Sequence, residues 1–199
     1  MYNLLRKFKF FICVAIFFTS GCAARDIQMA PNLTELRQLE SNVIINKNVG
    51  YYISNENRSK KVVTPGGGGD KLAYKPYSDF EGGLITVLSK VFAQVHPVDS
   101  LTDSKIKEKN IQFIFIPEIT TNSYSGSMLT WPPTEFKIDL SCEAVDRDGV
   151  VVWKKELHST GEAVFSEFKG DFSLAARRAS EFMILELFKE IEKDQHLFR

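Results

Sequence analysis

The residue types that most often carry chemistry are present in this chain, but their spacing matches no reaction centre. A run of four glycines, Gly66–Gly69, is of the kind that cradles phosphate groups. A phosphate-binding loop would continue with Lys and then Ser or Thr, whereas Asp70 follows here and would repel an anion. The glycines are therefore interpreted as part of a flexible polar loop over residues 55–70.

The histidines and a cluster of serines also lack the patterns that metal binding or nucleophilic catalysis requires. No metal-ligand spacing relates the three histidines to one another or to acidic residues; they are His96, His158 and His196. No Gly-x-Ser-x-Gly surrounds any of the clustered serines, Ser123, Ser125 and Ser127. We therefore expect no enzyme activity, no catalytic residue, no metal site and no cofactor.

Cys22 is the residue with the clearest chemical prediction. A basic start precedes an apolar run over residues 10–18, and Thr19-Ser20-Gly21 then leads directly to this cysteine. This order is typical of a secretory signal peptide, and the run is short for a membrane span. Cys after Ser-Gly resembles the bacterial lipoprotein signal, in which the cysteine receives acyl chains such as palmitate and becomes the new N-terminus. An ordinary signal peptide with an incidental cysteine, or an uncleaved anchor, remains the alternative.

The residue after Cys22 and the composition of the chain indicate where the protein is located and which kinds of partner and disulfide are excluded. Ala23 stands where an Asp would resemble an inner-membrane retention signal, so we expect a lipid anchor in the outer membrane, facing the periplasm. The 25 basic and 25 acidic residues give no basic surface for nucleic acid. With Cys13 removed and Cys22 lipidated, Cys142 is alone, so no disulfide framework is possible.

Five segments show the periodicity of regular structure. Strands are predicted over residues 42–54 and 111–119, the second ending at Pro117, and a helix from Ser78 to His96. Residues 136–144 alternate strictly, and residues 150–157 return as a second strand after a turn at 146–149, which predicts a hairpin with Cys142 on its buried face. The same turn chemistry accounts for its paired aspartates. A last helix is predicted from about Ser173 to Glu192.

These elements predict an α+β fold with a mainly antiparallel sheet and two helices packed on one face. The predicted organisation is a signal peptide over residues 1–21, a lipidated N-terminus and tether over 22–41, and a single periplasmic domain over 42–199.

A long Ser/Thr-rich loop over residues 120–133 is the candidate partner-binding segment. Aromatic and apolar side chains of the kind that dominate interfaces occur in it: Tyr124, Met128, Leu129 and Trp131. A loop without a partner, with Trp131-Pro132-Pro133 closing the end of the sheet, is the alternative interpretation.

The chain resembles the YajG-type and related small periplasmic lipoproteins, some of which are auxiliary parts of ABC transport systems. The resemblance covers residues 42–192 and rests on the signal ending at Cys22, the strand closed by Pro117, the Asp148-Gly149 turn with Trp153, and Leu174-Ala175-Ala176. It implies no catalytic residue.

Two functions therefore remain open. The first is a membrane-anchored, non-catalytic accessory or scaffold component of a cell-envelope complex, with a protein partner in the envelope and the membrane itself as a second partner. The second is a periplasmic module that binds a lipid or small molecule in a groove between the helices and the sheet.

Overall fold

A computed structural model describes residues 24–41, 44–66, 71–125 and 134–199. The strands are β1 (Arg25–Asp26), β2 (Ile45–Tyr52), β3 (Val62–Pro65), β4 (Lys71–Tyr74), β5 (Phe92–Val98), β6 (Ile111–Ser125), β7 (Thr134–Val145) and β8 (Val151–Ala163). The helices are α2 (Thr34–Gln38), α3 (Asn55–Ser59), α4 (Pro76–Val91), α5 (Ser104–Glu108), α6 (Phe165–Phe168) and α7 (Leu174–Lys193), followed by a 3-10 turn over Gln195–Phe198.

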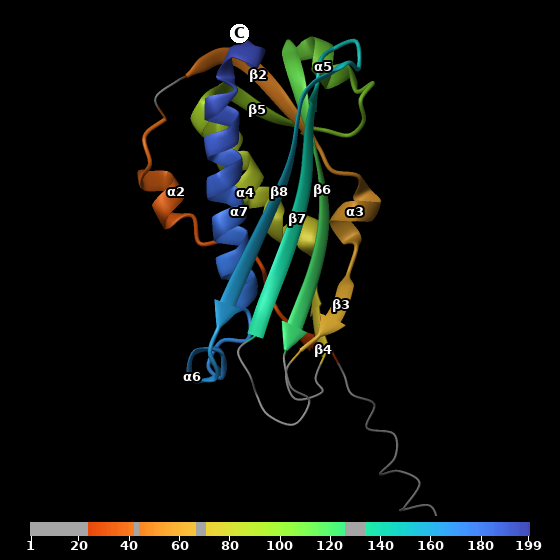
Figure 1. The fold of residues 1–199 in the computed structure, drawn as a ribbon. Coiled ribbons are helices and arrows are strands. Elements are labelled where there is room, and N and C mark those ends of the chain that lie inside the picture. Colours follow the sequence, from red (N-terminus) through yellow and green to blue (C-terminus); the bar gives the residue numbers. More distant parts are fainter. Residues whose placement is uncertain (1–23, 42–43, 67–70, 126–133) are drawn as a thin grey trace, which may run out of the picture.

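The main sheet has five strands in the order β5-β2-β6-β7-β8 and is mixed (Figure 1). Strands β5, β2 and β6 run parallel, whereas β6, β7 and β8 form an antiparallel meander. A smaller sheet, in the order β1-β4-β3, is also mixed. The α+β class is thus confirmed. The prediction of a mainly antiparallel sheet is wrong, and the described part of the chain contains six α-helices where two were expected.

The parallel pairing arises from a strand that the helical pattern concealed. Helix α4 ends at Val91, and residues 92–98, whose first half continues the helical spacing, form β5 instead. Among the described strands β5 pairs only with β2 and so lies at the edge of the sheet, where a proline such as Pro97 is tolerated. The start of α4 also differs, because the helix begins at Pro76 rather than after Ser78.

Pro117 does not end β6, which continues to Ser125 and pairs with β7 over its whole second half. Two residues beyond the proline, the Ile119 amide donates to the Tyr77 hydroxyl (3.1 Å) and not to β7. Alternate amides of a strand point to the same side, so the missing N–H of Pro117 also faces away from β7 and costs no ladder bond. The predicted loop over 120–133 is therefore strand up to Ser125.

The predicted hairpin is confirmed and is longer than expected. The alternating apolar residues of β7 are all buried, including Cys142. The turn is closed by Asp146, whose Oδ1 accepts from the amides of Asp148 and Val150, both at 2.9 Å. Gly149 has φ +79°, a left-handed conformation that favours glycine.

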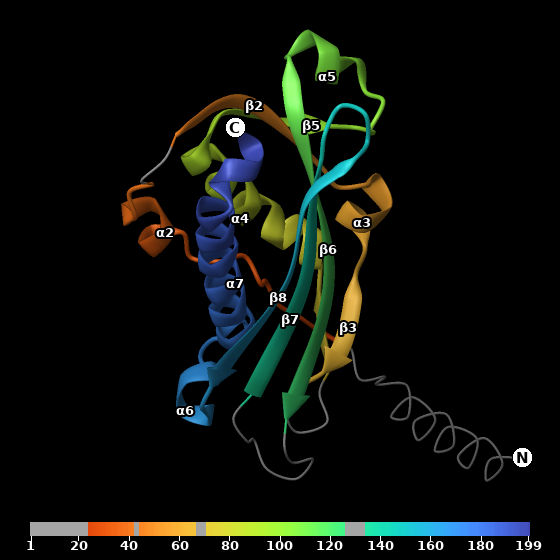
Figure 2. The ribbon, with the colours of Figure 1, turned by 45° about the horizontal axis from the view of Figure 1, so that its top comes forward.

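Helices α4 and α7 pack against one face of the main sheet, and two glycines allow their close approach (Figure 2). A Cβ on Gly161 of β8 would lie 2.1 Å from the carbonyl oxygen of Ala175 in α7. A Cβ on Gly83 of α4 would lie 2.7 Å from Ile184 of α7, so this glycine serves a helix–helix contact. Phe182 of α7 is not part of the buried core and is 53% exposed.

Residues 25–38, expected to belong to a tether, pack onto the domain. β1 pairs with β4, and α2 lies over α4. Ile27, Met29 and Leu36 are buried members of the main hydrophobic core. Apolar burial of this kind is worth about 1.5–3 kcal/mol per large side chain. The described part of the segment is therefore integral to the fold, and the domain begins near Arg25 rather than at residue 42.

Candidate functional site

An open groove of about 610 Å³ lies beside the small sheet and the starts of α4 and α7. Its size falls in the range of small-molecule sites, which is about 300–1,000 Å³. The lining combines charged, hydroxyl and apolar side chains: Asp26, Ile27, Gln28, Lys61, Ala73, Tyr74, Lys75, Asp79 and Ser173. The groove thus lies between the sheet and the helices, where the alternative function would need it.

Three hydrogen bonds hold the N-terminal segment along this groove. The Ile27 amide donates to the carbonyl of Ala73 (2.9 Å), which extends the β1–β4 pairing. The Gln28 amide donates to Oγ of Ser173 (3.1 Å), the residue before α7. The Met29 amide donates to Oδ2 of Asp79 (3.0 Å), in the first turn of α4. The groove wall is therefore built from residues distant in sequence.

Charges in the groove are balanced. Asp26 and Lys61 form an exposed ion pair (2.6 Å) across the small sheet. Burial raises the pKa of the Asp79 carboxyl, and the Met29 amide and the charge of Lys75 only partly oppose the shift. A groove with two lysines and two carboxylates suits a polar or charged small molecule better than a lipid tail. Among the residues that the structure describes, no group of three potential ligands could hold a metal ion.

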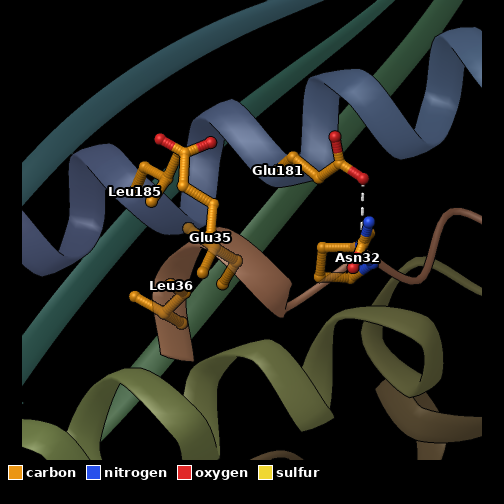
Figure 3. A pocket seen from close by; sticks show the side chains of 7 residues that line it. Asn32, Glu35, Leu36, Glu181 and Leu185 are labelled. Carbon is orange, nitrogen blue, oxygen red and sulfur yellow. Dashed lines mark hydrogen bonds between the residues drawn. The ribbon is translucent and has the colours of Figure 1, made fainter. Parts of the chain in front are cut away.

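A second pocket, of about 80 Å³, lies between α2 and α7 (Figure 3). Figure 3 shows α2 between α7 and α4. The backbone amide of Asn32 donates to Oε1 of Glu181 in α7 (3.0 Å), and the Leu36 side chain of α2 is buried. The volume is far below that of a metabolite site. This pocket is a gap left where the N-terminal segment packs.

The predicted partner-binding residues are only partly within the described structure. Tyr124 lies near the end of β6, with 62% of its surface exposed. Met128, Leu129 and Trp131 lie outside the described residues, as does the predicted lipidation site Cys22. The roles of these residues therefore stay predictions.

Other residues singled out in the sequence have structural roles. Ser123 is buried, and its hydroxyl donates to Oγ1 of Thr64 (2.7 Å), which ties β6 to β3. His158 contacts Asp139 (2.6 Å) on the exposed face of the meander. Glu81 of α4 accepts from Arg58 and from the Tyr51 hydroxyl (2.9 Å). Asp79 and Ser173, which shape the groove, had no sequence signal beyond positions near helix starts.

Comparison with known proteins gives a likeness of fold. No family model and no curated protein matches the chain. A Xanthomonas campestris protein assigned to the DUF330 family matches with a TM-score of 0.52 at 12% identity, over 87% of this chain and 95% of that chain. A Helicobacter pylori homolog of a neuraminyllactose-binding hemagglutinin gives 0.50 at 11% identity, over 87% and 97%. Lipoprotein B of Nitrosomonas europaea gives 0.50 at 6% identity, over 79% and 89%.

At these identities the matches show the fold alone. They agree, at that level, with the resemblance to small bacterial lipoproteins, whereas the narrower resemblance to YajG-type proteins stays a prediction. Within the described residues, no helix has the length and hydropathy to cross a membrane.

Proposed function

We propose that this protein is a bacterial lipoprotein, anchored in the outer membrane through acyl chains on Cys22, that acts without catalysis as an accessory component of an envelope complex. The observation that carries the proposal is the order of the leader: basic start, apolar run, then Ser20-Gly21-Cys22. The fold is compatible with it, since one protein of similar fold, from Nitrosomonas europaea, is itself described as a lipoprotein. Ala23 favours the outer membrane.

The anchor is tested by replacing Cys22 and, as a matched control, Cys13 in the same leader. Cys22→Ser should abolish labelling by an alkyne fatty acid and retention with outer-membrane markers, whereas Cys13→Ser should leave both unchanged. Retained lipid label in Cys22→Ser would refute the anchor. Fractionation of the parent protein with inner-membrane markers would refute the destination but leave lipidation standing.

The accessory role is tested by crosslinking from Tyr124, the described residue of the candidate partner-binding loop. A photo-crosslinking side chain at this exposed position should capture the same envelope protein in repeated preparations, and a probe at the exposed Phe182 should not. Equal capture at both positions, or none at Tyr124, would contradict a partner at this end. A reproducible enzyme activity lost on changing one polar residue would contradict the role as a whole.

A second candidate function is the binding of a small polar molecule in the groove. The groove volume of about 610 Å³ and its mixed lining of charged and hydroxyl side chains favour a polar ligand. Because the Helicobacter pylori protein is described by its likeness to a neuraminyllactose-binding protein, sialyllactose is a reasonable probe. Binding measured by calorimetry should weaken at least tenfold in Lys75→Ala and stay unchanged in Lys90→Ala, outside the groove. No heat of binding would exclude this ligand.

A further inference from the structure

The position of β1 limits how far the domain can stand from a lipid on Cys22. Only three peptide units separate Cys22 from Arg25, which is already paired with Leu72 of β4. Three residues reach at most about 11 Å even when fully extended. The hydrogen bonds of Ile27, Gln28 and Met29 then hold the following residues to the domain. A lipidated Cys22 therefore cannot act through a long tether.

The surface next to this attachment point is connected to α6 by a row of aromatic rings in edge-to-face contact. The Arg25 guanidinium lies 4.0 Å from the ring centre of Phe172. Phe172 contacts Phe168 (6.0 Å between centres), and Phe168 contacts Phe165 (5.5 Å). Phe168 is buried and acts as the rigid centre of this row. The start of β1 is thus fixed relative to α6.

Two apolar side chains at this end of the molecule are exposed, and we call them the apolar tip. Val164 is 48% exposed and Phe165 is 46% exposed. They lie between β8 and the start of α6, at the end of the sheet where β6 also ends, because Glu162 of β8 and Tyr124 of β6 both pair with Glu135 of β7. Figures 1 and 2 show α6, β3 and the end of β6 at one end of the sheet, opposite the C-terminus.

We infer that the apolar tip rests on the bilayer that holds the lipid anchor, so that the domain stands upright on the membrane. The inference rests on lipidation of Cys22, as proposed above. The apolar tip contacts the interfacial layer of the bilayer, because the attachment point brings lipid within about 11 Å of β1. Phe and Val favour the apolar side of this layer.

An upright domain has a defined outer end. β6 contains 15 residues, which at about 3.3 Å per residue span roughly 45 Å. The Asp146–Val150 turn lies at the far end of this strand, where Arg147 donates to the carbonyl of Ile111 (2.8 Å). The turn is therefore placed tens of ångströms above the membrane.

The test measures depth at the two ends of the full-length, lipidated protein. Ser166→Cys on α6 and Asp148→Cys in the turn each add one exposed thiol for a fluorophore. The buried Cys142 should not react, and parent protein labelled in parallel checks this. In vesicles of phosphatidylethanolamine and phosphatidylglycerol, lipids with a nitroxide near the headgroup should quench the probe at 166 at least fivefold more than that at 148.

Two variants separate membrane contact from mere proximity. Phe165→Ser should reduce quenching at position 166 at least twofold, whereas Phe182→Ser, an equally exposed phenylalanine on α7, should not. A ten-residue Gly-Ser insertion between Ala23 and Ala24 adds a flexible reach of about 17 Å and should also reduce quenching.

The outcomes distinguish the inference from the function on which it rests. An intact mass without acyl chains at Cys22 would overturn the proposed anchor and the inference together. An acylated protein with equal quenching at positions 166 and 148 would overturn the upright orientation alone. Equal effects of Phe165→Ser and Phe182→Ser, with position 166 still quenched, would overturn the contact by the apolar tip.

Discussion

Replacing Met29 with Ala asks directly whether the N-terminal segment is part of the folded domain. The Met29 side chain is fully buried in the main core, and its amide is fixed by Asp79. Truncating a buried Met to Ala costs about 2–5 kcal/mol of unfolding free energy. For a domain of this size each kcal/mol lowers Tm by about 2–4 °C. A loss near 3 kcal/mol therefore corresponds to a drop of about 6–12 °C in Tm.

The measurement is urea unfolding followed by far-UV circular dichroism, with thermal melting as a second observable. Gln28→Ala is the matched control, because this neighbouring side chain is exposed and only its backbone amide bonds to Ser173. The control should change the unfolding free energy by no more than about 0.5 kcal/mol. If Met29→Ala is as mild as Gln28→Ala, the segment is a tether after all, and the upright orientation loses its geometric basis.

Three further predictions follow from close packing and burial. Gly161→Ala should lower the free energy of unfolding by at least about 3 kcal/mol, because its Cβ would meet the backbone of α7. Gly82→Ala, whose Cβ meets nothing within 4 Å, should instead stabilise α4 by up to about 1 kcal/mol. Chemical unfolding of both variants checks this, and similar free energies of unfolding for the two would contradict it. Because burial raises the pKa of Asp79, the folded state holds its proton more tightly than the unfolded chain, and its contribution to stability falls as pH rises above about 4. Asp79→Asn, which keeps an acceptor for the Met29 amide, should therefore gain stability relative to the parent between pH 4 and pH 7 in urea titrations, and a constant difference would be contrary evidence. Burial raises the pKa of Cys142 to about 12, so its alkylation at pH 8 should be at least about a thousandfold slower in the native than in the unfolded protein, and equal rates would show that the faces of β7 are assigned wrongly.

The local sequence pattern was sufficient to predict an element where a segment has a strong hydrophobic period and its pairing partner lies nearby in the chain. Strict alternation from Phe136 to Ala144, with a turn that Asp146 closes through its own side chain, predicted the β7–β8 hairpin and the burial of Cys142. The apolar stripe of α7 predicted a helix within a residue or two of its observed ends. Both are decided within about 25 consecutive residues, so no distant contact was needed to predict them.

The leader is a second feature that the sequence alone addresses, since a processing signal is read as an extended chain by other proteins and does not depend on the fold. The prediction at Cys22 therefore comes entirely from the order of residues 6–22. The fold adds only the distance from that cysteine to the first strand.

Tertiary structure decided the features that depend on residues far apart in the chain. Residues 92–95 continue the helical spacing of α4 but form β5, because the edge of the sheet beside β2 offers hydrogen bonds that one more turn of helix cannot match. Pro117 reads as the end of a strand, but its missing N–H faces a side where no strand pairs. Ile27 and Met29 form too short a pattern to predict burial, and only Ala73, Asp79 and Ser173 supply the partners that fix them. Whether the N-terminus acts as a tether or as a wall of the domain is therefore decided by packing, since isolated apolar residues gain stability only where a distant surface receives them.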